Sequence, residues 1–197
     1  MPSPVGHSLT GYLIYRVAAK DAEDRWWTFA LYLAAANAPD LDFIPGLLMG
    51  NPGRYHHGPS HSVGFAILFG LALSLTMALF KRGDGRRNFS VFFSLYFSHV
   101  LLDYVGTDTS FPYGVPLLWP LSHEYYIAPF AFLPDIHRPV SSGMKFITGV
   151  FSLHNLLAAT VEALMVGFLI LLFTVRSGRV VNRSATREAS SKKMFPQ

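Results

Sequence analysis

An apolar segment of eighteen residues, positions 63–80, carries no charged side chain and is followed at once by a basic turn at positions 81–87. A helix needs ~20 predominantly apolar residues to cross the hydrocarbon core of a bilayer, so this segment approaches the required length. Charged residues make up only 14% of the 197 residues, whereas they make up about a quarter of an ordinary soluble domain. The chain is therefore expected to fold in a membrane.

Four further apolar segments accompany this one. Residues 89–105 and 146–175 are long enough for helices, and the shorter segments 5–19 and 26–38 would each be only ~20 Å long as helices, so they either span partly or pack as half-buried helices. Positions 106–145 contain six of the thirteen prolines, which predicts an irregular extracytoplasmic loop. We expect an all-α, multi-pass helical membrane protein of about five helical segments, with residues 1–175 as one membrane-embedded domain.

The last residues differ in composition from the rest of the chain. Residues 176–197 are rich in Ser, Arg and Lys and lack apolar periodicity, so we expect a disordered basic cytoplasmic tail, either solvated or attracted to anionic lipid. The remaining basic residues do not form a stripe interleaved with aromatic residues, so no nucleic-acid partner is expected. The expected partner is the lipid bilayer.

The basic residues also predict an orientation. If the five segments alternate in direction, thirteen of the sixteen Lys and Arg residues fall on one side of the membrane and only Arg54, Arg138 and Lys145 on the other. Cytoplasmic loops are enriched in Lys and Arg, so the side with thirteen should be the cytoplasm. The same threading puts all eight histidines near the extracytoplasmic face of a cytoplasmic (inner) membrane.

Two of the histidine clusters have the spacing of metal ligands. His99 and Asp103 are four residues apart in a predicted helix, so their side chains should project from one face and can bind the same ion. A buried hydrogen bond between them is the alternative. His56 and His61 bracket a Gly-Pro-Ser turn that leads into segment 63–80, where Ser60 or Ser62 can cap the helix. A surface turn with spare histidines is the alternative there.

Further donors lie beside short turns. Asp40 and Asp42 follow segment 26–38 and can cap it, face solvent or supply oxygen ligands, and His7 follows a glycine near the N-terminus. The chain contains no cysteine, so a metal would have to be held by nitrogen and oxygen. Donors of this kind suit Zn²⁺ best and Mn²⁺ or Fe²⁺ as alternatives, as one ion or as two that share a carboxylate. The predicted metal ligands are His7, Asp40, Asp42, His56, His61, His99 and Asp103.

Other ionisable residues are weaker candidates. They lie in or beside the proline-rich loop or within the last apolar segment: His123, Glu124, His137, His154 and Glu162. The chain has neither a Gly-x-Ser-x-Gly elbow nor a phosphate-cradling glycine loop, which disfavours serine hydrolase chemistry.

Several of these motifs occur in an order that is typical of one protein family. GHS at residues 6–8, PDLD at 39–42, HHGPSHS at 56–62, SHVLLD at 98–103 and GVPLLWP at 114–120 resemble the LexA-binding, inner-membrane-associated hydrolase family. The resemblance implies a metal-dependent hydrolase, distantly similar to zinc-dependent phospholipase C. It also implies that His7, Asp40, His61, His99 and Asp103 are metal ligands, with Asp42 and His56 as further ligands or their partners. The LexA association is carried by the family name alone.

Two positions differ from the pattern of that family. His57 stands where relatives often carry Arg, and Phe43 stands where some carry His; either difference bears on the charge of the preferred substrate. The expected function is a membrane-bound metal-dependent hydrolase, in which metal-activated water attacks an ester, with a phosphoester such as a phospholipid as the preferred substrate. The alternative is a non-enzymatic membrane protein with a structural metal site or a polar cluster that conducts ions or protons.

Overall fold

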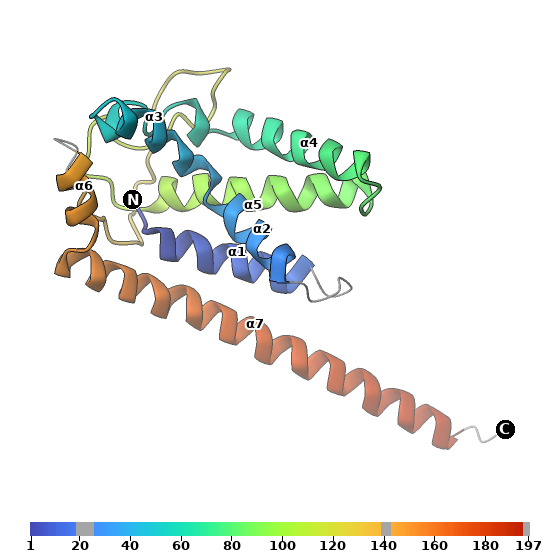
Figure 1. Cartoon of the computed structure of the whole chain (residues 1–197). Coiled ribbons are helices and arrows are strands. Elements are labelled where there is room, and N and C mark those ends of the chain that lie inside the picture. The colour runs from blue at the N-terminus through green and yellow to red at the C-terminus, as the bar shows by residue number, and fades with distance from the viewer. Residues whose placement is uncertain (19–25, 139–142, 195–197) are drawn as a thin grey trace.

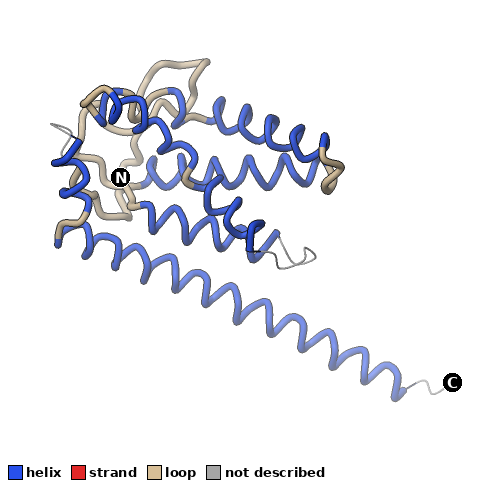
Figure 2. The backbone as a smooth tube through the Cα atoms, in the orientation of Figure 1, coloured by secondary structure: helices blue, strands red, loops and turns tan. Residues whose placement is uncertain are grey.

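The computed structural model describes residues 1–18, 26–138 and 143–194. Throughout these residues the secondary structure is helical, with seven α-helices, three short 3-10 helices and no strand (Figure 2). The α-helices are α1 (Pro4–Ala18), α2 (Trp26–Ala36), α3 (Phe43–Leu48), α4 (Val63–Leu79), α5 (Gly85–Val105), α6 (Gly143–Val150) and α7 (Leu153–Met194). The 3-10 helices are η1 (Ala38–Asp42), η2 (Pro52–Arg54) and η3 (Pro59–His61). The all-α prediction is confirmed.

Two of the predicted apolar segments have different bounds in the structure. Segment 26–38 ends as an α-helix at Ala36, and η1 follows with Pro39 in its first turn. Segment 146–175 is divided between α6 and α7, and the Ser152 hydroxyl accepts a hydrogen bond from the Asn155 backbone N–H (3.3 Å) at the start of α7. Apolar composition alone does not mark such a break, because both helices are apolar.

The C-terminal part of α7 includes most of the predicted tail. The helix continues to Met194 and extends beyond the other helices (Figure 1), while residues 195–197 lie outside the described residues. The division of the chain at residue 175 stays a prediction.

Helices α4 and α5 form an antiparallel pair joined by a short turn (Figure 1). Ser62 caps α4, since its hydroxyl oxygen accepts a hydrogen bond from the Phe65 N–H (3.1 Å), and Asp84 caps α5 in the same way through the Arg87 N–H (2.9 Å). Buried Ala66 on α4 packs with Tyr96 and Val100 on α5 and with Val115 of the following loop. The start of α4 and the end of α5 are thereby held together.

Helices α1 and α2 pack against each other and against the part of α5 that contains Phe92 and Leu95. A Cβ atom at Gly11 would lie 2.7 Å from the Ala36 Cβ, so the absence of a side chain there permits the close approach of α1 to α2. Ala35 and Ala36 join Phe92 and Leu95 in a second buried cluster. The C-terminal end of α2 is thereby placed beside α5, which brings η1 close to His99.

Helix α7 is attached to α1 through a buried carboxylate. Glu162 accepts hydrogen bonds from the Ser3 N–H at 2.9 Å to each of its oxygens and from the Ser3 hydroxyl. Residues 153–176 of α7 are long and apolar enough to cross a membrane by length and composition, while Trp26–Ala36 and Val63–Leu79 are shorter apolar helices. One membrane-spanning helix is thus supported, and a multi-pass arrangement stays a prediction.

The short helices and the long loop gather at one end of the bundle. There η1, α3, η2, η3 and the loop that follows α5 lie together, and the turn between α4 and α5 lies at the opposite end (Figure 1). The loop is anchored by two isolated bridges, Gly106 with Leu133 and Val115 with Tyr126. This end of the molecule holds most of the predicted site residues.

Candidate metal centre

Five of the predicted ligands meet at this end of the molecule, and they come from four different elements. His7 is on α1, Asp40 on η1, His61 on η3, and His99 and Asp103 on α5. The imidazoles and the Asp103 carboxylate are fully buried, whereas the Asp40 side chain is 23% exposed. Solvent therefore reaches part of the Asp40 side chain, although its Oδ1 is buried.

Four of these residues place one donor atom each within 3.6 Å of a neighbouring donor. The Asp103 Oδ2 lies 3.2 Å from the His99 Nε2 and 3.4 Å from the His61 Nε2, and the Asp40 Oδ1 lies 3.5 and 3.6 Å from the same two nitrogens. Bonds of 2.0–2.1 Å to a tetrahedral Zn²⁺ put neighbouring ligand atoms about 3.3–3.4 Å apart. The four distances in this four-donor cluster are close to those between ligands that share one ion.

His7 adds a fifth donor beside the same carboxylate. Its Nε2 is 3.5 Å from the Asp103 Oδ1, the oxygen that does not face His61 and His99. Its ring stacks on that of His99, with ring centres 3.6 Å apart and planes at 14°. Asp103 thus presents one oxygen to the four-donor cluster and the other to His7, which is the arrangement expected of a carboxylate shared by two ions or of a five-ligand site.

The donor atoms of this group have no hydrogen-bond partners among the described residues. Seven of the nine buried side-chain nitrogen and oxygen atoms without a partner belong to these five residues: both nitrogens of His7, the Asp40 Oδ1, the Nε2 atoms of His61 and His99, and both oxygens of Asp103. An unsatisfied buried polar group costs roughly 1–3 kcal/mol, and more when it is charged. A cation bound by one nitrogen of each imidazole and by the two carboxylates would satisfy these atoms except for the second nitrogen of His7, so the residues present fit a metal.

Two imidazoles are oriented by hydrogen bonds on the far side of the ring. The His99 Nδ1 donates to the Ala36 carbonyl (2.8 Å), and the His61 Nδ1 lies 3.1 Å from the Asp42 Oδ2. A ring that donates from Nδ1 keeps the lone pair of Nε2 for a metal, and in proteins the partners of metal-bound histidines commonly impose this tautomer.

Asp42 and His56 lie in a layer behind the four-donor cluster. The Asp42 carboxylate accepts hydrogen bonds from the His56 Nδ1 (2.9 Å) and the Ser60 hydroxyl (2.7 Å) in addition to His61. The His56 Nε2 in turn accepts a hydrogen bond from the Arg138 guanidinium (2.6 Å). Both residues were predicted as ligands, and this stays a prediction: their hydrogen bonds can position His61, and with Asp40 they also place three donor atoms within 4.8 Å of one another.

The protonation of this layer follows from its contacts. Burial opposes ionisation of Asp42, but hydrogen bonds from His56 and His61 outweigh it and lower the pKa of Asp42 to about 2. Burial, assisted by Arg138, lowers the pKa of His56 to about 4 against the opposing effect of Asp42. Near neutral pH, Asp42 is therefore ionised and His56 is neutral, which matches the direction of the hydrogen bonds.

The pKa of His61 is shifted in the opposite direction. Burial alone would lower it, but the nearby Asp40 carboxylate, the hydrogen bond to Asp42 and the charge of Asp103 raise the pKa of His61 to about 9. Burial likewise opposes ionisation of Asp40, but the charge on His99 and the close approach of the His61 and His99 imidazoles hold the pKa of Asp40 well below its usual value. In the protein without metal, the cluster thus holds protons where a cation would otherwise sit.

The weaker candidates do not join this group. His137 and His154 stack on each other, with ring centres 3.8 Å apart, and the His154 Nε2 donates to the Asp135 carbonyl (2.9 Å). His123 and Glu124 are exposed in the loop. Glu162 is bonded to Ser3, as described above.

Several contributors to the site were not predicted from the sequence. Arg138 reaches His56 across 82 residues of chain, and the Ala36 carbonyl and the Ser60 hydroxyl orient His99 and Asp42. A backbone carbonyl carries no sequence signal. Arg138 lies among prolines in a loop, where no periodicity indicates which way a side chain points.

The model of one protein family, described as YdjM inner membrane protein, matches residues 1–182 of this chain. No curated protein and no solved structure matches it.

Proposed function

Because the chain belongs to the YdjM inner membrane protein family, we propose that it is an inner-membrane hydrolase that uses one or two divalent metal ions. The observation that carries this proposal is the set of seven buried, unpartnered donor atoms on His7, Asp40, His61, His99 and Asp103. Their convergence from four elements is costly unless a ligand satisfies them. An inner-membrane location follows from the family; the hydrolase activity is our proposal.

The charge and the chemical type of the donors favour zinc. Asp40 and Asp103 together supply two negative charges, which balance a divalent cation when the imidazoles are neutral. Nitrogen and carboxylate donors suit Zn²⁺, and the same donors also bind Mn²⁺ or Fe²⁺. His61, His99, Asp40 and Asp103 would hold one ion, and His7 would complete its shell or contribute to a second ion through Asp103.

The chain's own residues would orient the metal site and give the substrate access to it. When bound, a divalent ion lowers the pKa of its water from 15.7 to about 7 and polarises a phosphoryl oxygen. Asp42 and the Ala36 carbonyl keep the Nε2 atoms of His61 and His99 aimed at the cluster. The partly exposed side chain of Asp40 would give water access, and the cavity at His56 and His57 would give the substrate access.

The proposed reaction is the hydrolysis of a phosphoester. The oxygen of water bonds to phosphorus, the bond between phosphorus and the ester oxygen breaks, and a proton from the water ends on the leaving alcohol. The preference for a phosphoester rests on the distant similarity to zinc-dependent phospholipase C that the sequence motifs imply. This is an analogy between families and is part of the proposal.

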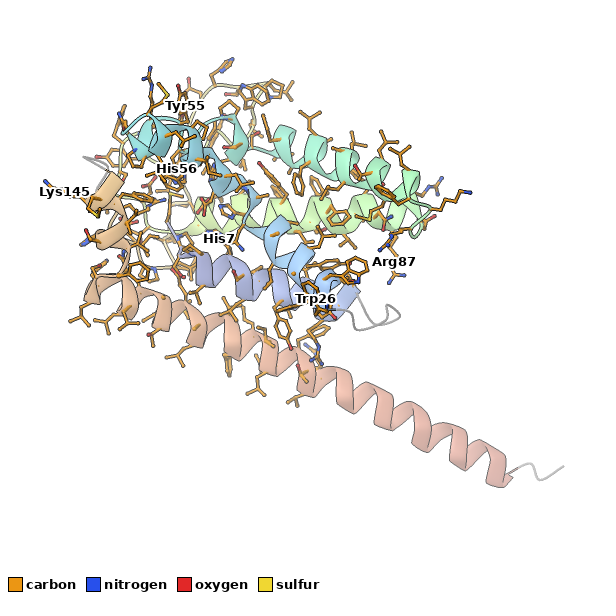
Figure 3. All side chains as sticks on the ribbon, viewed as in Figure 1. His7, Trp26, Tyr55, His56, Arg87 and Lys145 are labelled. Carbon is orange, nitrogen blue, oxygen red and sulfur yellow. The ribbon has the colours of Figure 1, made fainter. Side chains whose placement is uncertain are left out.

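We further propose that α4 and α5 cross the membrane together with α7, with the metal centre at the extracytoplasmic face. Large apolar side chains of α4 are exposed along its length: Ile67, Leu68, Leu71, Leu75 and Leu79. A surface of this kind is unfavourable in water and favourable against lipid. His56 and Arg87 lie at opposite ends of the molecule (Figure 3), as expected if the basic α4–α5 turn is cytoplasmic.

Two observations favour catalysis over the alternatives of a structural metal or an ion path. A structural metal is enclosed by protein ligands, whereas here Asp40 is partly exposed and a cavity adjoins the site at His56 and His57. An ion path needs ionisable groups available through the depth of the membrane. Glu162, which lies within the span of α7, has both oxygens bonded to Ser3 and so is engaged in holding α1.

Metal content tests the proposal directly. Detergent-purified wild type, analysed by elemental mass spectrometry, is expected to contain near-stoichiometric zinc or manganese, and the double variant His99→Ala, Asp103→Ala is expected to lose it. A double variant of the exposed loop residues, His123→Ala and Glu124→Ala, likewise removes one imidazole and one carboxylate and is expected to retain the metal. Wild type that stays metal-free after reconstitution with Zn²⁺, Mn²⁺ or Fe²⁺ would contradict the mechanism.

A further inference from the structure

A cavity of about 410 Å³ adjoins the metal centre on the side of η2. Its polar lining consists of Asn51, Arg54, His56, His57, Ser110 and Arg138. Phe43, Phe111 and Pro112 provide the apolar part. Tyr55 and His56, labelled in Figure 3, show where this end of the molecule lies.

The lining of this cavity has a positive charge. Two guanidinium groups, those of Arg54 and Arg138, border it, and none of the described lining residues is acidic. Arg138 is held in place by its hydrogen bond to the His56 Nε2 and by the Phe43 ring, whose centre is 5.5 Å from the guanidinium carbon. Guanidinium groups bind phosphate and carboxylate through paired hydrogen bonds, so the charge selects an anion.

His57 supplies a buried polar atom that lacks a partner. The residue is 3% exposed, and its Nε2 has no hydrogen-bond partner among the described residues. Its Nδ1 faces the Asp108 carboxylate at 3.5 Å. Its backbone has a φ of +60°, a left-handed conformation that is uncommon for residues other than glycine. His57 thus brings a buried nitrogen without a partner to the wall of the cavity.

The inner end of the cavity is next to the metal centre. His56, His57 and His61 each offer a ring nitrogen, and these three nitrogens lie within 4.8 Å of one another. Arg138 is also connected to the metal ligand His61, because His56 and Asp42 bridge them by hydrogen bonds. An anion bound by the two arginines would thus lie close to the four-donor cluster.

We infer that this cavity binds the phosphate group of the substrate, with Arg54, Arg138 and His57 as its ligands and with Phe43, Phe111 and Pro112 against its organic part. Phe111 is 86% exposed, so an apolar group has a surface to contact at the mouth. The inference deepens the proposed hydrolase function and rests on it. It assigns the substrate to the phosphoesters that carry an apolar group, whether these are soluble or part of a lipid.

Phosphate binding can be measured separately from catalysis. Inorganic phosphate is titrated by calorimetry into the detergent-purified full chain, once after chelator treatment and once loaded with zinc. Wild type is expected to bind phosphate in both forms, and the double variant Arg54→Gln, Arg138→Gln to bind at least tenfold more weakly in both. Arg86→Gln, which removes an exposed arginine at the opposite end of α5, is the matched control and is expected to bind as wild type does.

A single variant guards against misfolding, because Arg138 also contacts His56. Arg54 is exposed, so Arg54→Gln should leave the fold intact and still weaken phosphate binding by severalfold. Unchanged phosphate affinity in both the single and the double variant would overturn the inference.

Turnover separates a failure of this inference from a failure of the proposed function. If zinc-loaded wild type hydrolyses para-nitrophenyl phosphate, the arginine variants should raise KM at least tenfold with a smaller change in kcat. Active enzyme with an unchanged KM in these variants would overturn the cavity assignment and leave the hydrolase intact. Phosphate binding that depends on the arginines, without any hydrolysis, would support the cavity and count against the hydrolase.

A second substrate shows whether the phosphoester is a membrane lipid or a soluble molecule. Wild type is assayed on phosphatidylcholine vesicles that contain phosphatidic acid, in parallel with the aryl phosphate. Preference for the lipid assigns a membrane substrate, and preference for the aryl phosphate a soluble one. In either case the activity must depend on Arg54 and Arg138, and activity independent of both would overturn the inference.

Discussion

Replacing Asp42 by asparagine tests whether this residue supports the metal centre without binding the ion. The Asp42 carboxylate accepts hydrogen bonds from the His61 Nδ1 (3.1 Å), the His56 Nδ1 (2.9 Å) and the Ser60 hydroxyl (2.7 Å). An amide has one acceptor oxygen, and its NH₂ group must face one of the two imidazoles. Both Nδ1 atoms must remain donors, since Arg138 donates to the His56 Nε2 and the His61 Nε2 faces the cluster. One donor–donor contact is therefore unavoidable in Asp42→Asn.

The cost of that contact sets the expected loss of metal affinity. One unsatisfied buried hydrogen bond costs roughly 1–3 kcal/mol, and removal of the partner of a metal-bound histidine weakens metal binding by about 10–100-fold. We expect Asp42→Asn to weaken zinc binding within this range, measured by competition with a chromophoric chelator near neutral pH. Asp103→Asn, which alters a predicted ligand, should lose far more.

Asp84→Asn is the matched control for this measurement. Asp84 caps α5 at the opposite end of the molecule, and asparagine caps helices as well as aspartate does. Metal loss in Asp42→Asn as complete as in Asp103→Asn would show that Asp42 binds the ion itself. An affinity equal to that of Asp84→Asn would show that the hydrogen bonds do not support the site. Either result would refute the reasoning.

Four further outcomes are expected. Removal of the ion with a chelator should lower the Tm of wild type, but not that of His99→Ala, Asp103→Ala, because a ligand that binds only the folded state stabilises it; equal shifts in thermal denaturation would contradict this. Zinc affinity should rise at least tenfold per pH unit up to pH about 9, because the pKa of His61 is raised to about 9 and its proton must leave before metal binds; a flat titration over this range would argue against it. Glu162→Ala should destabilise the protein by ~1–3 kcal/mol, because it leaves the Ser3 N–H unpaired, and an unchanged Tm in detergent would contradict the role of this carboxylate in holding α7 to α1. Gly6→Ala should lower the Tm as well, since its Cβ would lie 2.8 Å from the Glu162 Oε2, and the double variant with Glu162→Ala should lose less than the sum of the two.

Much of the helical architecture could be predicted because apolar composition marks helices that contact lipid or a core. Segment 63–80 corresponds to α4 (Val63–Leu79), and segment 5–19 to α1 (Pro4–Ala18). Helix α5 begins at Gly85, four residues before the apolar segment that was predicted at residue 89. Its first turn is polar and exposed, and the cap from Asp84 determines its start. A search for apolar segments therefore does not detect this polar first turn.

The sequence also predicted correctly that His99 and Asp103 approach each other, because residues four apart in a helix share a face. It did not distinguish the roles of Asp40 and Asp42, which differ by two positions on η1. Asp40 faces His61 and His99, whereas Asp42 faces His56 and Ser60. A short 3-10 turn has no long periodicity from which these directions could be predicted.

The sequence by itself determined the kind of site that this protein can build. Without cysteine and with histidine and aspartate beside apolar segments, any metal centre must use nitrogen and oxygen donors. Only the tertiary structure decided which donors meet. The contact of α1 with α5 brings His7 to Asp103, and a contact across 82 residues brings Arg138 to His56. Such contacts depend on how whole helices and loops pack, and local spacing carries no information about that packing.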